Sequence, residues 1–135
     1  MTNIKSGHRF ENWLCEELAK HGFWSHNLAM NASGQPADVI AIKSNFVALI
    51  DCKECRTTRP FPFSRVEDNQ HLAMEMFAER TIGLGWFAIK TFSGQVFMIR
   101  HAEIKMCMEL GMKSFPQAEL GEHGMTLERW LEVIG

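Results

Sequence analysis

Apolar positions recur along the chain at two spacings, one typical of amphipathic helices and one typical of buried strands. Repeats of three and four residues predict a first helix that begins at Ser6 or Gly7 and ends before Gly22, and a second that follows Glu67 or Asp68. Runs rich in Val, Ile, Leu and Phe predict strands at residues 23–30, 37–42, 46–53, 86–92 and 95–100. Further helices are expected at residues 102–110 and 126–133, and a loop at residues 31–36.

The order of these elements, α-β-β-β-α-β-β-α, predicts the fold class α/β, with a mixed β-sheet flanked by helices. The runs at residues 37–42 and 46–53 are apolar at consecutive positions, as expected of strands covered on both faces. No repeat, linker or low-complexity tract divides the 135 residues. We therefore expect one domain, with a core at about 7–100 and a C-terminal helical extension at about 101–135.

The turn between the two central strands sets which residues face each other. A turn centred between Ser44 and Asn45 places Asp38 directly opposite Asp51, where Cβ atoms are ~5 Å apart and like charges repel. Lys53 lies two residues beyond Asp51 and therefore points to the same face. Two opposed acids in an apolar sheet predict a divalent cation between them. The alternative, a turn residue plus a same-face Asp51–Lys53 ion pair, leaves the opposition of the two acids unexplained.

Two polar residues occupy helix positions where apolar side chains are expected. Glu11 shares or borders the inward stripe of the first helix, and Gln70 lies at the N-terminal end of the inward stripe of the second. An inward carboxylate costs several kcal/mol unless it is paired, protonated or close to a cation. We therefore expect both side chains to approach the acids of the hairpin, although Glu11 alone would more often be a surface acid.

This group of residues indicates a specific chemistry. Carboxylate oxygens are hard ligands that suit Mg²⁺ or Mn²⁺, and Mg²⁺ is commonly shared between protein carboxylates and a substrate phosphate. Such an ion lowers the pKa of bound water and neutralises charge that develops on a phosphoryl group. Lys53 would orient or deprotonate the attacking water, or stabilise the developing charge.

Charge narrows the choice of substrate. The net charge of −2 by itself argues against a nucleic-acid partner. Residues 53–65, however, contain four basic residues and a single acid, Glu54. We interpret this basic strip as a phosphate-binding surface, with a solvated loop as the equally weighted alternative. Its candidate DNA-binding residues are Arg56, Arg59 and Arg65.

Phe61 and Phe63 belong to the same proline-containing loop. One hypothesis is that they form an aromatic wedge against an unstacked base or a DNA junction. The alternative is that the loop folds back and places the rings in the core.

The number of cysteines and the length of apolar runs bear on the cellular compartment. Four cysteines are too few for a disulfide scaffold, so we expect a reducing cytoplasm. No apolar run approaches the ~20 residues of a membrane span.

Cys52 and Cys55 form a CxxC motif, but the other cysteines and the six histidines lack paired zinc-ligand spacing. Zinc and redox functions are therefore not favoured, and the nine methionines are interpreted as core or dimer filling.

The candidate residues also resemble a known family pattern. Their order is Glu11, then Gln35-Pro36-Ala37-Asp38, then Asp51-Cys52-Lys53. This order resembles the Glu…PD…(D/E)xK pattern of restriction-endonuclease-like nucleases, except that Ala37 separates the proline from Asp38 and that Asp51 replaces the commoner Glu. The loop at residues 54–63 and the Asn69-Gln70 pair resemble, more narrowly, the Holliday junction resolvases, especially the RecU-like branch of bacteria and phages.

The resemblance covers about residues 7–100. It implies Mg²⁺- or Mn²⁺-dependent phosphodiester hydrolysis in four-way or other branched DNA by a homodimer. It assigns the metal to Asp38, Asp51, the backbone carbonyl of Cys52 and, through water, Glu11. It makes Lys53 the catalytic lysine, Glu11 the helix-borne acid and Gln70 a supporting residue of the catalytic site.

Two alternatives to a resolvase remain. One is a nuclease for other DNA structures or ends, of a repair or restriction type. The other is a non-catalytic DNA-binding module of the same fold, which the intact Asp38, Asp51 and Lys53 make less favourable.

Overall fold

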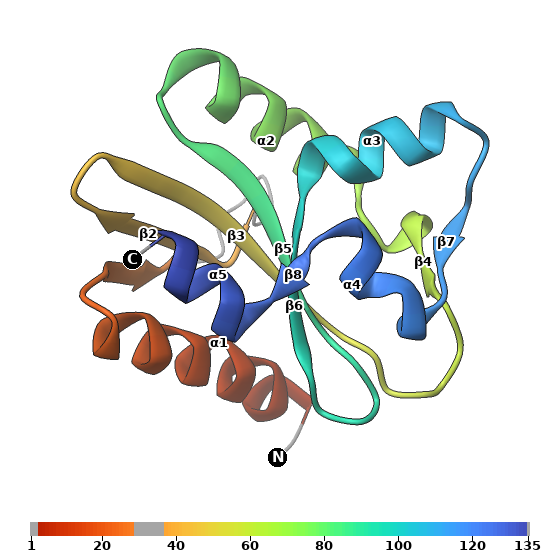
Figure 1. Cartoon of the computed structure of the whole chain (residues 1–135), viewed down its shortest axis with the longest axis horizontal. Coiled ribbons are helices and arrows are strands. Elements are labelled where there is room, and N and C mark those ends of the chain that lie inside the picture. The colour runs from red at the N-terminus through yellow and green to blue at the C-terminus, as the bar shows by residue number, and fades with distance from the viewer. Residues whose placement is uncertain (1–2, 29–36, 135) are drawn as a thin grey trace.

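The computed structural model describes residues 3–28 and 37–134 of the chain (Figure 1). In these residues a six-stranded mixed sheet is flanked by helices, which confirms the predicted α/β class. The helices are α1 (Asn3–Lys20), α2 (Asp68–Arg80), α3 (His101–Glu109), α4 (Leu120–His123) and α5 (Leu127–Ile134), with 3-10 turns η1 (Phe63–Arg65) and η2 (Gln117–Glu119). The strands are β1 (Trp24–Asn27), β2 (Val39–Lys43), β3 (Phe46–Glu54), β4 (Phe61–Pro62), β5 (Leu84–Lys90), β6 (Val96–Arg100), β7 (Ser114–Phe115) and β8 (Met125–Thr126).

Strand β3 has a partner on each side and carries the candidate residues at its C-terminal half. The order across the sheet is β1-β2-β3-β5-β6-β8. All neighbouring pairs are antiparallel except β3 and β5, which are parallel. A parallel pair needs a long crossover, and α2 provides it. This crossover places the N-terminal end of α2 beside the C-terminal end of β3.

The register of the β2–β3 hairpin agrees with the prediction. Val39 faces Ile50, and the two central turn residues are Ser44 and Asn45. Ser44 has a φ of 51°, the left-handed conformation that a two-residue hairpin turn requires. Asp38 lies one residue before this paired stretch: its N–H donates to the carbonyl of Ile50 at 3.0 Å, and its carboxylate accepts from the N–H of Cys52 at 2.7 Å, so it lies beside Asp51 without being its strand partner.

Two apolar clusters cover the two faces of the sheet. One lies between the sheet and helices α1 and α5, and the other lies between the sheet and helices α2, α3 and α4. Trp130 of α5 is fully buried in the first cluster. It stacks on Phe23 at 5.6 Å between ring centroids and meets Phe46 and Trp86 edge-on. The C-terminal helix therefore closes the α1 face of the sheet.

The residues that connect β3 to α2 differ from their predicted structure. They contain a two-residue strand, β4, which pairs with β7 from the C-terminal part of the chain. This pairing buries Phe61 and Phe63 at 0% and 3% exposure, and Phe63 meets Phe115 edge-on at 4.7 Å. The hypothesis of an exposed aromatic wedge is therefore wrong, and the folded-back alternative is correct.

Other differences concern the ends of elements. Helix α1 begins at Asn3, several residues before the predicted start, whereas α2 follows Glu67 as expected. The strand predicted at 23–30 is described only over Trp24–Asn27. Residues 29–36 lie outside the described part of the chain. They include the end of this predicted strand, the predicted loop at 31–36 and the Gln35-Pro36 portion of the motif. Among those described, no helix has both the length and the apolar character to span a membrane.

The position of Trp130 predicts how strongly α5 stabilises the domain. Trp130→Ala should lower the free energy of unfolding by about 3–5 kcal/mol in urea titrations followed by circular dichroism. Trp130→Phe should cost less than ~1.5 kcal/mol, because it keeps an aromatic ring and removes an indole N–H that has no hydrogen-bond partner in the described structure. Val133→Ala, on the exposed side of the same helix, is the control. Equal stabilities for all three variants would contradict a closing role for α5.

Candidate active site

Four elements bring the five predicted catalytic residues together. Asp38 immediately precedes β2, and Asp51 and Lys53 lie on β3. Glu11 projects from the middle of α1, and Gln70 belongs to the first turn of α2. The alternation of side chains along β3 places Asp51 and Lys53 on one face, as predicted.

Lys53, Asp51 and Gln70 form a closed triangle of polar contacts. The Lys53 Nζ lies 2.9 Å from Oδ2 of Asp51 and donates to Oε1 of Gln70 at 3.2 Å. Nε2 of Gln70 donates to Oδ1 of Asp51 at 3.2 Å. The side chains of Lys53 and Asp51 are only 12% and 3% exposed. The ammonium is thus held in one place by a carboxylate and an amide.

Gln70 connects this triangle to the start of α2. Its Oε1 also accepts a hydrogen bond from the backbone N–H of Glu67 at 3.1 Å, as part of a reciprocal capping box. A capping box satisfies backbone N–H groups that the first turn of a helix leaves without partners. One amide therefore both begins the helix and orients the lysine.

Asp38 is fixed to β3 by its side chain as well as by its backbone. Its Oδ2 accepts a hydrogen bond from the backbone N–H of Cys52 at 2.7 Å. Its own N–H donates to the carbonyl of Ile50 at 3.0 Å, and its carbonyl accepts from Leu28 at 2.8 Å. The carboxylate therefore stays next to Asp51 instead of turning towards solvent.

Asp38 raises the pKa values of two neighbouring acids, Asp51 and Glu11. Burial, followed by the charge of Asp38, raises the pKa of Asp51 to about 7, even though Lys53 acts in the opposite direction. Burial, again followed by Asp38, raises the pKa of Glu11 to about 7. Asp38 thus links a carboxylate from α1 and a carboxylate from β3 into one crowded group.

This donor set fits a hard divalent cation. Glu11 and Asp51 both lie close enough to Asp38 for its charge to raise their pKa values, although Lys53 provides a positive charge 2.9 Å from Asp51. Mg²⁺ and Mn²⁺ prefer carboxylate oxygen over nitrogen or sulfur. Asp38 and Asp51 would hold the ion, whereas the backbone carbonyl of Cys52 and a contact of Glu11 through water stay predictions.

The predicted DNA-binding arginines lie on the surface that follows β3. Arg56, Arg59 and Arg65 are all exposed, and they line a surface cavity of about 360 Å³. Arg65 donates to the backbone carbonyl of Glu54 at 3.0 Å and lies 5.6 Å from the centre of the Phe61 ring. Arg56 is 3.9 Å from the carboxylate of Glu54. Glu54 is thus a neighbour shared by Arg56 and Arg65. The sequence did not predict this, because the contact with Arg65 uses only the backbone of Glu54.

The two cysteines of the CxxC motif are on opposite sides of the sheet. Cys52 packs against the cluster beneath α1, whereas Cys55 belongs to the cluster beneath α2 and α3. Burial is the main cause of the raised pKa of both thiols. This placement disfavours a shared metal or a disulfide, in agreement with the sequence analysis.

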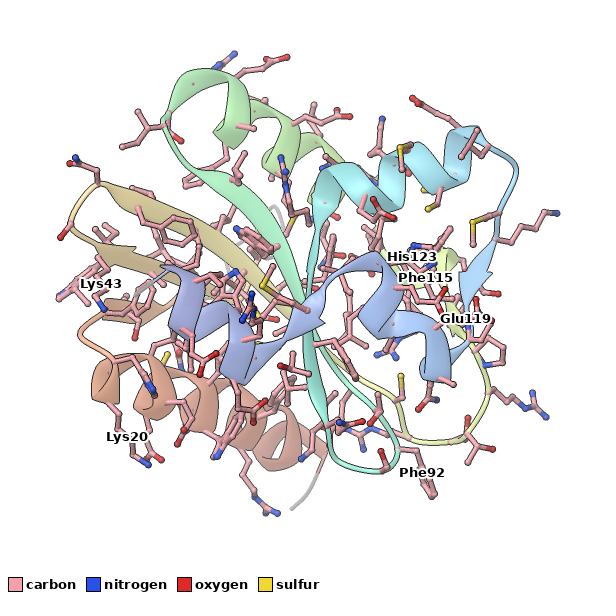
Figure 2. The ribbon with its side chains drawn as sticks, in the orientation of Figure 1. Lys20, Lys43, Phe92, Phe115, Glu119 and His123 are labelled. Carbon is pink, nitrogen blue, oxygen red and sulfur yellow. The ribbon has the colours of Figure 1, made fainter. Side chains whose placement is uncertain are left out.

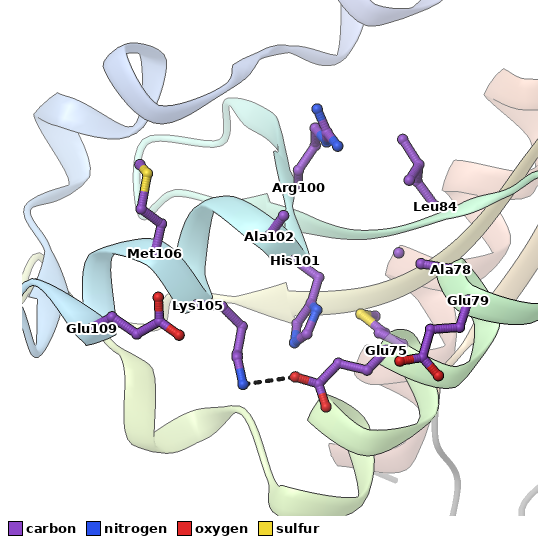
Figure 3. A pocket seen from close by; sticks show the side chains of 12 residues that line it. Glu75, Ala78, Glu79, Leu84, Arg100, His101, Ala102, Lys105, Met106 and Glu109 are labelled. Carbon is purple, nitrogen blue, oxygen red and sulfur yellow. Dashed lines mark ion pairs between the residues drawn. The ribbon is translucent and has the colours of Figure 1, made fainter.

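A separate groove of about 500 Å³ lies between α2 and α3, and Figure 3 shows its lining. Glu75 and Lys105 form an ion pair of 2.7 Å across it. Nε2 of His101 is 2.9 Å from Nδ1 of His71, and burial together with this neighbour lowers the pKa of His101 to about 4. The acids of the candidate active site do not line this groove, so we do not assign the reaction to it.

The mixed α/β fold and the grouping of Asp38, Asp51 and Lys53 are those expected of the nuclease class that the sequence resembles. The chain matches the archaeal Holliday junction resolvase (Hjc) family over residues 2–132, and it belongs to that family. By family it is an endonuclease for branched DNA. No individually curated protein matches it significantly.

A solved structure, the Hjc Holliday junction resolvase from the archaeal hyperthermophile Archaeoglobus fulgidus, has a similar fold. Its TM-score is 0.69 at 22% sequence identity, and the match covers 95% of this chain and 99% of that chain. At this identity the likeness bears on the fold alone. It agrees with the mixed sheet and flanking helices described above.

The raised pKa of Asp51 predicts a pH-dependent stability in metal-free protein. The folded state binds this proton more tightly than the unfolded chain, whose ordinary pKa is 3.8. The resulting stabilisation is complete below pH ~4 and is lost as the pH rises through about 7. Wild type should therefore lose on the order of 2–4 kcal/mol across this range relative to Asp51→Asn, which has no such proton.

Added Mn²⁺ should restore the stability of the wild type at the high-pH end and have little effect on Asp51→Asn. Urea titrations at a series of pH values, with and without the ion, make this measurement. If the free energies of unfolding of the two proteins change with pH in parallel, the folded state does not bind the Asp51 proton more tightly than the unfolded chain does, and the prediction is contradicted.

Proposed function

We propose that this protein is a metal-dependent endonuclease that resolves four-way DNA junctions by hydrolysing phosphodiester bonds. One observation carries this proposal: Asp38, Asp51, Lys53 and Gln70 converge at the end of a buried strand in a chain of the Hjc family. The acids supply hard ligands and the lysine supplies a fixed positive charge.

Asp38 and Asp51 would hold Mg²⁺ or Mn²⁺, with Glu11 contributing through a bound water. The ion when bound activates water and offsets charge on the phosphate. Lys53 is placed to donate hydrogen bonds to a non-bridging phosphate oxygen or to the attacking water. Gln70 keeps the ammonium in position by accepting one of its hydrogen bonds. Because Lys53 is mostly buried, its interaction with an incoming phosphate is screened less than that of a surface lysine.

Arg56, Arg59 and Arg65 would bind the DNA backbone next to this centre. Their surface follows directly from the strand that bears Asp51 and Lys53. Electrostatic contacts to phosphates position DNA without reading its sequence. This assignment suits a substrate recognised by its branched shape.

We also infer that the active form is a homodimer. A four-way junction offers two equivalent strands, and a two-fold dimer presents two copies of one site in symmetric positions. The narrower likeness to the RecU-like branch, a phage origin and a cytoplasmic location remain predictions.

The central test separates metal ligation from DNA binding. Asp51→Asn should reduce junction cleavage at least about 100-fold, because it removes a charged ligand and leaves the shape of the side chain. Junction binding should be unchanged or tighter, since one negative charge is removed. Asp68→Asn, which alters an exposed aspartate on α2, is the matched control.

Cleavage assays on four-way junctions, flaps, nicked duplexes and linear duplexes, each with Mg²⁺, decide among the functions. Symmetric cuts in the four-way junction support a resolvase, whereas cuts in the other substrates alone support a repair or restriction nuclease. Binding without cleavage in any metal condition would support the non-catalytic alternative. Full activity in Asp51→Asn would overturn the assignment of the site.

The basic strip makes a separate prediction about affinity. Arg56→Ala and Arg59→Ala should each weaken junction binding several-fold and reduce the slope of log affinity against log salt by about 1 for each phosphate that the variant no longer neutralises. Arg129→Ala, an exposed arginine on α5, should leave both quantities unchanged. Filter binding over a range of salt concentrations measures both. An unchanged slope in the two loop variants would assign DNA binding to another surface.

A further inference from the structure

Three residues of different chemistry meet between α3 and α4, away from the nuclease centre. Glu103 and Cys107 are one helical turn apart and project from the same side of α3. His123 ends α4, and Figure 2 shows it beside Phe115. Nδ1 of His123 lies 2.8 Å from Oε2 of Glu103 and 3.9 Å from Sγ of Cys107, and Sγ is 3.7 Å from Oε2.

The three side chains approach one common point and do not form the proton relay of a catalytic triad. Both contacts of His123 use the same ring nitrogen, Nδ1, whereas a Cys–His–Glu catalytic triad needs one partner on each nitrogen. Cys107 is also only 2% exposed, so its thiol is not accessible to a large substrate. A nucleophilic function is therefore excluded by the geometry, whereas three lone-pair donors around one point are what a bound cation requires.

The distances are close to those of a tetrahedral metal site. With metal–ligand distances of about 2.0–2.3 Å, tetrahedral angles separate the ligand atoms by about 3.3–3.6 Å. The three observed separations differ from these values by about 0.5 Å or less. Small side-chain adjustments would therefore admit an ion.

The surroundings also favour a fixed site. The imidazole of His123 stacks on the fully buried Phe115 at 4.1 Å between ring centroids, with an angle of 19° between the rings. Glu103 and His123 are part of the lining of a cavity of about 440 Å³, which gives an ion and a water molecule access from solvent. The same cavity contains Arg100 and Glu122, which carry opposite charges.

We propose that Glu103, Cys107 and His123 form a second metal site, specific for a transition-metal ion of the Zn²⁺ type, with water as the fourth ligand. Thiolate and imidazole ligands favour Zn²⁺ and disfavour Mg²⁺. On binding, the S–H bond of Cys107 breaks, its proton passes to solvent, and the sulfur retains the electron pair that it donates to the metal. The N–H bond of His123 Nδ1, which faces Glu103, also breaks; the imidazole takes up a proton from solvent at Nε2 instead, and the Nδ1 lone pair binds the metal. No oxidation or reduction takes place. This inference does not depend on the proposed nuclease function.

The site would stabilise the part of the chain that holds the basic strip. Its ligands lie on both sides of residues 110–119, which include β7 and Gln117. Nε2 of Gln117 donates to the backbone carbonyls of Thr57 and Arg59, each at 2.7 Å, and Oε1 accepts from the N–H of Phe92. A metal that joins α3 to α4 would therefore hold Gln117 against the loop that presents Arg59.

Cobalt titration of the full chain tests this proposal, with saturating Mg²⁺ present to occupy the carboxylate centre. We expect one equivalent of Co²⁺ to give visible bands of tetrahedral cobalt and a near-ultraviolet band from thiolate-to-cobalt charge transfer. Added Zn²⁺ should remove these bands by displacement. Zn²⁺ at about 100 times its dissociation constant should raise Tm by about 8 °C.

Variants show whether these signals come from the three residues. Cys107→Ser should abolish the charge-transfer band, and His123→Gln should weaken Co²⁺ binding at least about tenfold. Cys15→Ser changes a thiol on α1, and Asp51→Asn changes the nuclease centre; both should retain the spectrum of the wild type. If Cys107→Ser fails to fold by circular dichroism, Glu103→Gln and His123→Gln decide the question, since both side chains are partly exposed.

Several results would overturn the proposal. The first is a wild-type protein that shows no charge-transfer band at stoichiometric Co²⁺. The second is a band that persists in folded Cys107→Ser, and the third is a Co²⁺ affinity that does not change in His123→Gln. Loss of the band in Asp51→Asn alone would assign the cobalt to the nuclease centre and would equally overturn it.

Discussion

The closeness of Asp38 and Asp51 in a buried hairpin is the constraint on which the candidate site depends. A two-residue turn at Ser44 and Asn45 fixes the register, and a shift of one residue would send one acid to the other face. The hydrogen bond from the N–H of Cys52 to Asp38 then prevents the carboxylates from moving apart. Repulsion between them is thus built into the strands and is relieved by protonation, by Lys53 or by a bound cation.

The surrounding helices complete the site through side chains that also have structural functions. Gln70 shows this most clearly, because the same Oε1 accepts hydrogen bonds from the first turn of α2 and from Lys53. A change in the start of α2 would therefore move the ammonium group of Lys53. Glu11 approaches Asp38 from α1, whose apolar residues are anchored beneath Trp130 in the same cluster. Packing of the C-terminal helix thus contributes indirectly to the position of an acid far away in the sequence.

The parts of the site that the sequence predicts are those governed by short-range periodicity. The strand alternation that pairs Asp51 with Lys53 and the helical spacing that turns Gln70 inward both follow from local geometry. The β4–β7 pairing does not, because two-residue strands have no periodic signal and their partners are more than fifty residues apart. That pairing decides whether Phe61 is a wedge or a core residue. For the same reason the apposition of Cys107 and His123 cannot be read from their spacing, since it arises from the path of residues 110–119.

The two groups of candidate ligands differ in a way that would keep their metals separate. The nuclease centre offers carboxylate oxygens around a lysine, and this combination suits a hard ion that exchanges readily and can bind a phosphate. The group between α3 and α4 offers sulfur and nitrogen with one oxygen, and this combination binds softer ions more tightly. Cys52 adjoins the nuclease centre, but its thiol packs into the apolar cluster beneath α1. Because β3 alternates its side chains, Asp51 and Lys53 lie on the face opposite this sulfur. On both proposals, the chain would hold a hydrolytic ion and a structural ion at sites of different ligand chemistry.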